Sequence, residues 1–256
     1  MSFSVTSEHD RIYRCGRGRE TSLQAIFEII ERRRSAYERH PFIRFLRDET
    51  VPAEQRLAYA PFGSHFVLTF GEFNRDFLHE DEPDSPQQEM INEHAAEDQT
   101  HFAWFLHDLK VLGFDRECRF TDVLRFLWSD EGKHARELGH YVIAAARDAS
   151  AELRLVIIEA LEAQGNVWLS ATARAASSHP QRERLVYFSQ HHLERETGHA
   201  IGSEVEDIRS CVLPESMRPR AEALVHGIFD RTESFCDEML SRTHAALESG
   251  THFLSE

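Results

Sequence analysis

The spacing of apolar residues constrains this chain more than any other feature. In every long patterned segment they recur at intervals of three and four, as in Leu23, Ile26, Phe27 and Ile30, and no run alternates convincingly with a period of two. Intervals of three and four place side chains on one face of an α-helix, whereas a strand needs a period of two. The sequence therefore predicts an all-α protein in which helix is the only regular element.

About seven helices are expected, and some of their ends carry recognisable signals. Ser85 followed by Pro86 is typical of a helix start, and Gly113 is typical of the end of that same helix. A chain of 256 residues without internal repeats is expected to form a single domain (1–256), with residues 1–19 as a flexible N-terminal segment. The predicted helices span residues 20–39, 53–79, 86–112, 119–148, 150–177, 180–209 and 217–248.

Composition excludes several classes of function. Lysine and arginine number 29 against 44 acidic residues, and the net charge of -15 has the wrong sign for binding nucleic acid. No apolar run approaches the roughly 20 residues of a membrane helix, and the N-terminus lacks a signal-peptide pattern, so we expect a cytoplasmic protein without a membrane partner. The four cysteines are far apart and include no CxxC, which indicates neither a zinc knuckle nor a disulfide framework.

One short motif occurs twice. Residues 94–101 read HAAEDQTH and residues 192–199 read HLERETGH, so both fit the pattern H-x3-[DE]-x2-H. On a helix, positions i, i+4 and i+7 fall within a fan of roughly 60° on one face. Each copy therefore brings together two histidines and an acid, which are side chains of metal-ligand type.

The first copy lies on an apolar helix face. Asp98 has Ile91, Phe102 and Phe105 as its helical neighbours. An unpaired buried carboxylate is costly, so a ligand role or a buried ion pair with histidine explains Asp98 better than a solvated surface does. Glu97 is an alternative ligand to Asp98.

The second copy also has apolar neighbours, because His192 follows Leu185 and Phe188 at helical spacing. A third helix is expected to add a bridging carboxylate. Glu162 shares its face with apolar residues, whereas the alternative Glu159 shares its face with Glu152 and Asn166. A buried salt bridge to an arginine would be the structural explanation of Glu162.

Mixed imidazole and carboxylate ligands suit iron(II) and manganese, and helical bundles build dimetal centres from ligands on facing helices. We expect a pair of Fe²⁺ ions, with manganese as the second option. Arg195, Gln190 and Asn166 are candidates for orienting the ligands through hydrogen bonds. The predicted metal ligands are His94, Asp98, His101, Glu162, His192, Glu196 and His199.

Four segments of the chain resemble the heme-oxygenase-like superfamily, specifically its diiron oxidase branch, which is related in fold to the TenA and PqqC families. They are residues 40–78, EHAAEDQTHFAWFLHDLKVLGF, EALEAQGNVWL and YFSQHHLERETGHA, and the resemblance covers roughly residues 20–210 in the family's order. It implies a heme-oxygenase-like helical bundle.

The resemblance also implies ligands. In that family the last motif (here His192, Glu196 and His199) binds iron, the fifth helix supplies a carboxylate matching Glu162, and the third helix supplies an acid and a histidine matching His101. Many members place a glutamate seven residues before that histidine, where this sequence has His94. Others place the acid three residues before it, where this sequence has Asp98.

The implied function is that of an iron-dependent oxidoreductase, which activates O2 at a diiron or mononuclear site and oxidises a small organic substrate. The expected partners are that substrate, O2 and a reductant, with a homodimer as an optional assembly. The alternative is a metal-free TenA/PqqC-like enzyme, or a helical binding or interaction protein that uses the same cavity. TenA-type chemistry needs a nucleophilic cysteine, and Cys211 and Cys236 lack a matching sequence context.

Overall fold

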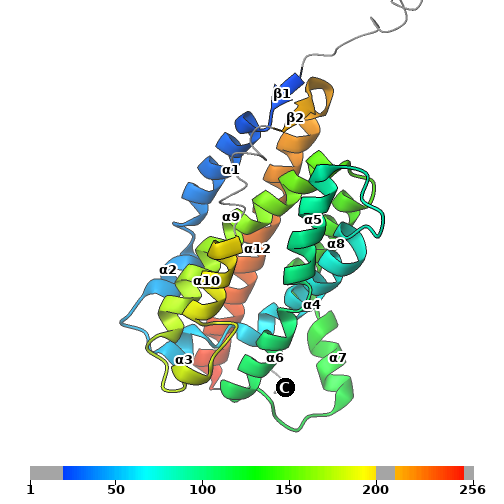
Figure 1. Cartoon of the computed structure of the whole chain (residues 1–256). Helices are drawn as coiled ribbons and strands as arrows, with labels where there is room; N and C mark the ends of the chain where they lie inside the picture. Colours follow the sequence, from blue (N-terminus) through cyan, green and yellow to red (C-terminus); the bar gives the residue numbers. More distant parts are fainter. Residues whose placement is uncertain (1–19, 200–210, 251–256) are drawn as a thin grey trace, which may run out of the picture.

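The computed structural model describes residues 20–199 and 211–250, and of residues 20–22 and 196–199 it describes the backbone alone. The chain forms a bundle of helices of unequal length, with one small pair of strands at one end (Figure 1). The elements are β1 (Glu20–Ser22), α1 (Gln24–Tyr37), α2 (Pro41–Arg47), α3 (Ala53–Arg56), η2 (Ala60–Gly63), α4 (Ser64–Phe73), η3 (Asn74–Leu78), α5 (Pro86–Asp98), α6 (Phe102–Val111), α7 (Phe120–Trp128), η4 (Asp130–Gly132), α8 (Lys133–Arg147), α9 (Ala151–Ala176), η5 (Arg182–Arg184), α10 (Gln190–His199), β2 (Val212–Pro214), η6 (Glu215–Met217) and α12 (Arg218–Ser249).

Helix α9 lies in the middle of the bundle (Figure 1). It contacts α1, α2, α5, α8, α10 and α12, and residues 153–158 are all buried. Five of these six residues are aliphatic, as a helix surrounded by other helices requires. The sixth, Arg154, bonds through its guanidinium to Glu80 and Gln88. Because α9 crosses the interior, Glu162 in its middle is carried inside the bundle.

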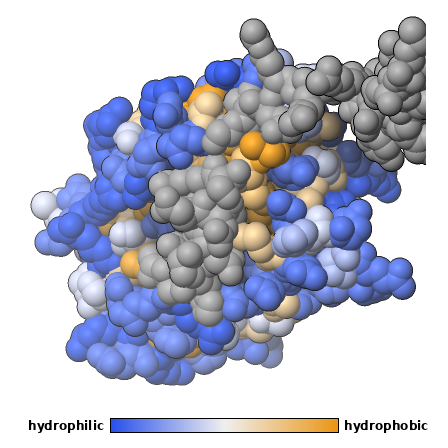
Figure 2. All heavy atoms as spheres, turned by 45° about the horizontal axis from the view of Figure 1, so that its top comes forward, coloured by the Kyte–Doolittle hydropathy of each residue, from blue (hydrophilic) through white to orange (hydrophobic). Residues whose placement is uncertain are grey.

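Helix α12 is the second long helix and packs along α8, α9 and α1. Its buried side chains, among them Ile228, Phe229 and Phe235, join those of α9 in one apolar core. Figure 2 shows a mostly hydrophilic face with apolar residues in small areas. The apolar side chains are thus concentrated between the helices, as the three- and four-residue spacing predicts.

The predictions for the two longest helices are confirmed. The segments 150–177 and 217–248 correspond to α9 and α12 within a residue or two, and 20–39 contains α1. No described helix combines the length and apolar character of a transmembrane span. The segment predicted to be flexible, residues 1–19, lies outside the described residues.

The prediction of one helix over 53–79 is wrong. The segment divides into α3, η2, α4 and the π-helix η3. Pro61 has no N–H to donate and restricts the residue before it, so an α-helix cannot run through it without interruption. Farther along, the Asn74 amide donates to the carbonyl oxygen of Phe70 at 3.0 Å, where the backbone changes to π-helix.

The predicted helix over 86–112 is also interrupted, between Asp98 and Phe102, although no proline or glycine lies there. The interruption coincides with a close contact from another helix of the bundle. Helix α4 approaches this turn so closely that a Cβ added at Gly71 would lie 3.1 Å from the Gln99 carbonyl oxygen. The turn is closed by the His101 N–H, which donates to the Asp98 carbonyl oxygen at 3.2 Å.

Two further predicted helices are shorter than expected. The segment 119–148 divides into α7 and α8. Arg136 caps α7 from outside by donating to the carbonyl oxygens of Leu127 and Ser129 at 2.9 and 2.8 Å, which satisfies acceptors that a continuous helix would have used. In the segment 180–209, regular α-helix begins only at Gln190, and residues 200–210 lie outside the described part.

A two-stranded antiparallel sheet was not expected. Strand β1 pairs with β2 in the register Glu20↔Pro214, Thr21↔Leu213 and Ser22↔Val212. Strands of three residues are too short for an alternating pattern to appear in the sequence. The pair connects the start of α1 to the start of α12.

Candidate metal centre

The turn between α5 and α6 places the first motif around one carboxylate. Asp98, the last residue of α5, is 5% exposed. Its two oxygens face different histidines: Oδ2 lies 3.3 Å from Nε2 of His94, and Oδ1 lies 3.6 Å from Nδ1 of His101. His94 precedes the turn and His101 directly precedes α6, so the motif spans two helices rather than one face of a single helix.

Helix α9 adds a second carboxylate. Glu162 Oε1 lies 4.0 Å from His94 Nε2. His94, Asp98 and Glu162 can each offer one ligand atom so that all three atoms lie within 4.8 Å of one another. At metal–ligand distances of about 2.1 Å, two ligand atoms on one ion are about 3–4 Å apart. The three side chains therefore need only small movements to share a divalent ion.

Helix α10 brings the second motif to the same place. The Nδ1 of His192 lies 2.8 Å from the carbonyl oxygen of Tyr187, and because a carbonyl can only accept, Nδ1 carries the proton. The other nitrogen, Nε2, then carries no proton in the neutral ring and is within hydrogen-bonding distance of Nδ1 of His101, at 3.3 Å. A histidine that donates one N–H to a backbone carbonyl and presents its other nitrogen is the usual arrangement of a metal ligand.

Aromatic side chains surround the two histidines. The ring of Trp104 stacks on His101 at a centroid distance of 4.5 Å and meets His192 at 5.4 Å. Tyr187 lies 4.7 Å from His192, and the guanidinium of Arg195 lies 5.6 Å from the centre of the Trp104 ring. These rings restrict the orientation of both imidazoles and limit the access of water.

One residue that the sequence analysis missed holds this arrangement. Asp108 on α6 is fully buried and accepts hydrogen bonds from the N–H groups of Val186 at 2.9 and 3.1 Å and of Phe188 at 2.9 Å. These two residues flank Tyr187, whose carbonyl orients His192. Burial raises the pKa of Asp108, and the backbone donors oppose the rise. The signal was present, because Asp108 follows Phe105 by three residues on an apolar face.

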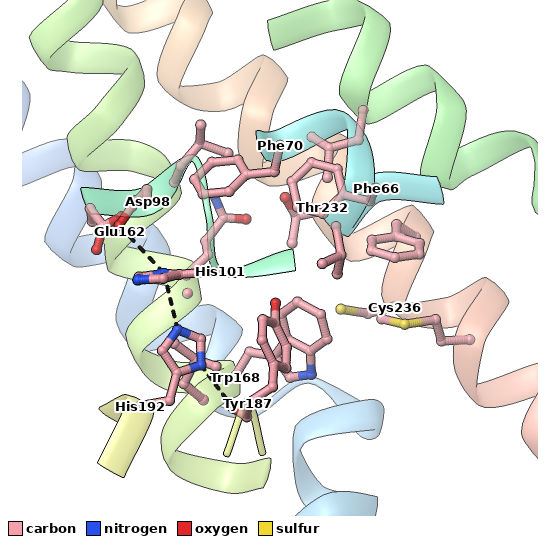
Figure 3. Close-up of a pocket in the computed structure, with 18 of the residues that line it drawn as sticks. Phe66, Phe70, Asp98, His101, Glu162, Trp168, Tyr187, His192, Thr232 and Cys236 are labelled. Atoms are coloured by element: carbon pink, nitrogen blue, oxygen red, sulfur yellow. Dashed lines mark hydrogen bonds and ion pairs between the residues drawn. The ribbon is translucent and has the colours of Figure 1, made fainter. Parts of the chain in front are cut away.

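The cluster closes one end of a cavity. The cavity has a volume of about 90 Å³. Figure 3 shows Asp98, His101, Glu162 and His192 at one side of this space, with Phe66, Phe70, Thr232 and Cys236 at the other. Most of the remaining wall is apolar, from α4, α9 and α12. The arrangement places groups of metal-ligand type directly beside an apolar space.

Not every predicted site residue can be placed. The side chains of Glu196 and His199 lie outside the described residues. The alternatives Glu97 and Glu159 belong neither to the described cluster of possible metal ligands nor to the cavity wall. Asn166 does not line the described cavity either, so of the three predicted orienting residues, Arg195 is the one with a described contact near the cluster.

The fold can be compared with known proteins. No protein-family model matches the chain, and no curated protein matches it in sequence. A solved structure with a similar fold is that of a domain of unknown function with a heme oxygenase-like fold from Shewanella denitrificans OS217. The two chains are 17% identical and superpose with a TM-score of 0.63, over 91% of this chain and 97% of the other. The predicted heme oxygenase-like fold is confirmed; a fold does not by itself carry a function.

Proposed function

We propose that this chain is an iron-dependent oxidoreductase that uses O2 to oxidise a small organic substrate. One observation carries the proposal: two carboxylates and three histidines from α5, α9, α10 and the turn before α6 lie together, and four of these five side chains line the end of an apolar cavity. Mixed imidazole and carboxylate donors suit iron(II), and an apolar cavity with a few polar groups suits an organic substrate.

The donor set fits such an ion. His94, Asp98 and Glu162 would hold it, with His101 and His192 beside them. When bound, iron would supply the reduction of O2, which the side chains cannot perform. The second motif adds Glu196 and His199 to the proposed ligands, in the pattern of a two-ion centre.

The protein itself would orient the ligand side chains and exclude water from the centre. The Tyr187 carbonyl keeps the proton of His192 on Nδ1, so that Nε2 would be the nitrogen that binds iron. Trp104 packs against both His101 and His192. Aromatic and aliphatic walls hold the substrate beside the centre and keep water away from it.

The alternative function without a metal has two forms. In a TenA-like enzyme the nucleophile would be a cysteine in the cavity, and among the described residues Cys236 lines it. Burial raises the pKa of its thiol to about 12, so the reactive thiolate is scarce at neutral pH. This argues against nucleophilic chemistry at Cys236. The second form, a helical binding protein that uses the cavity, would need no metal.

Metal analysis separates these functions. The full chain is purified without chelator, reconstituted anaerobically with ferrous iron, desalted, and assayed for bound iron. We expect about two iron ions per chain, or one if the site is mononuclear, and consumption of O2 after a reductant is added. Protein that retains no iron after this treatment would exclude the proposed function and favour the metal-free alternative.

A further inference from the structure

Gly165 occupies an unusual position in the middle of α9. Glycine inside a helix is destabilising relative to alanine, so its presence calls for a reason. At Gly71 an added Cβ would lie 3.1 Å from a backbone oxygen, and at Gly139 and Gly227 it would lie 2.8 and 2.2 Å from a neighbouring side chain. At Gly165 nothing lies within 4 Å of an added Cβ. Close packing therefore does not explain this glycine.

The space beside Gly165 belongs to the cavity. Gly165 lines the cavity together with Glu162, one turn before it, and Trp168 and Leu169, one turn after it. These four residues form one face of α9, because helical positions three and four apart are neighbours. A larger side chain at position 165 would project into the cavity next to the carboxylate of the candidate metal centre. The missing side chain thus provides part of the room there.

Outside the candidate centre, the described part of the cavity wall has no positively charged side chain. None of the described residues that line it is a lysine or an arginine. Outside the candidate centre, its polar side chains are neutral: Tyr37 and Cys236 bond to each other at 3.1 Å, and the Gln164 amide donates to the carbonyl oxygen of Ala160 at 2.6 Å. A carboxylate or phosphate in this part of the cavity would be buried without a partner, which is costly.

Thr232 is a further polar side chain of the wall, in addition to Tyr187, Trp168, whose indole N–H donates to the Tyr59 hydroxyl, and Gln164, whose Oε1 is buried without a hydrogen bond within 20–199 or 211–250. It lies on α12, lines the cavity, and is 9% exposed. Its hydroxyl makes no hydrogen bond to any residue within 20–199 or 211–250. A hydroxyl can donate and accept, so it can pair with an alcohol, an amine or a carbonyl group of a ligand.

The size of the cavity limits the ligand. The volume of about 90 Å³ is of the same order as the apolar cavity of about 150 Å³ that binds benzene, so a ligand of roughly six to nine non-hydrogen atoms is the size to test. We propose that the cavity binds an uncharged, mostly apolar molecule of about this many non-hydrogen atoms, in the room that Gly165 leaves beside the metal centre and with a polar group at the Thr232 hydroxyl. This inference rests on the proposed function, because it names the substrate class of that centre.

Three probes of similar size test whether the cavity prefers uncharged ligands: toluene, benzyl alcohol and benzoate. Their binding to the full chain is measured by ligand-observed NMR, on both chelator-treated and iron-loaded protein. On chelator-treated protein we expect toluene and benzyl alcohol to bind at least tenfold more tightly than benzoate. Equal or tighter binding of benzoate, or no binding of either uncharged probe, would overturn the proposal.

Two variants at position 165 test the location. Gly165→Leu fills the space and should weaken toluene binding at least tenfold, while Gly165→Ala, the helix-propensity control, should weaken it less. Both variants should melt at a temperature no lower than the wild type, because alanine and leucine favour helix over glycine. Unchanged toluene binding by a folded Gly165→Leu variant contradicts the proposal.

One variant tests the role of Thr232, with benzyl alcohol and toluene as a matched pair of ligands. Thr232→Val keeps the shape of the side chain and removes the hydroxyl. We expect benzyl alcohol to bind roughly 2- to 10-fold more weakly and toluene to bind as before, since a neutral hydrogen bond has about this net value. Iron content, measured on the same samples, separates the two ideas: loss of iron binding in the wild type counts against the proposed function, whereas altered probe selectivity counts against the substrate class.

Discussion

The two ends of the cavity are built from different chemistry. At one end, buried histidines and acids lie within hydrogen-bonding or ion-pairing distance of one another; at the other, Phe66, Phe235 and Met239 pack as they would in any helical core. Polar groups at the first end have to be buried at a cost, whereas apolar groups at the second end stabilise the fold. The difference predicts that most substitutions at one end of the cavity leave the other end unchanged.

The largest expected effect is on stability at the apolar end. Phe235 is 2% exposed and its ring lies 5.7 Å from that of Phe66. Phe235→Ala should lower the free energy of unfolding by about 3–5 kcal/mol, because it leaves a cavity in the core. Urea denaturation measures the loss. The folded variant should bind as much iron as the wild type, and a folded variant without iron would show that the two ends are coupled.

At the polar end, we expect a large loss of iron binding and little change in the fold. His192→Ala should weaken iron binding at least about 100-fold, while the helical circular dichroism stays near that of the wild type. Titration against a competing chelator gives the affinity. The matched control is His191→Ala, which changes the exposed neighbouring histidine and should leave the affinity unchanged. If both variants bind iron like the wild type, His192 is not a ligand.

A substitution at Asp108 is expected to lower both the stability of the fold and the affinity for iron. Asp108→Asn removes the carboxylate that accepts from the N–H groups of Val186 and Phe188, and should cost about 1–3 kcal/mol of stability. Because the loop that orients His192 loosens, iron affinity should fall about tenfold as well. Denaturation and chelator competition measure the two effects. The exposed Asp76→Asn variant serves as control and should change stability by less than about 0.5 kcal/mol. A stability loss without any change in iron affinity would refute the orienting role.

The smallest effect is expected at the pair formed by Tyr37 and Cys236. Cys236→Ala leaves the buried Tyr37 hydroxyl without its sulfur partner and should cost about 1 kcal/mol. The same change at the exposed Cys118 should cost less than about 0.5 kcal/mol, and both are measured by urea denaturation. Iron binding should be unaffected in both variants. Loss of iron in Cys236→Ala would place this pair in the metal centre.

How far the sequence predicts the structure depends on the range of the interactions. Helices α9 and α12 were predicted well because their apolar spacing and ends are local features. The turn after Asp98 was not predicted, because it depends on the approach of α4 at Gly71, which no local pattern reveals.

The same limit applies to the candidate site. The sequence identified His94, Asp98, His101, Glu162 and His192, and the structure brings these five residues together. The sequence identified these residues because polar and charged side chains on apolar helix faces are unusual. The assumption that His94 and His101 share one helix was wrong, and their role as ligands stays a prediction. The role of Gly165 was not predicted, because an empty space has no signature in a sequence.

The strand pair β1–β2 has a consequence for the order of folding. Its partners Ser22 and Val212 are separated by most of the chain, so their meeting closes a very long loop. Three residue pairs form too few hydrogen bonds to offset that loss of chain entropy. We therefore expect the strand pair to form only after α1 and α12 have docked on α9. Its amide protons should be among the first to exchange with solvent.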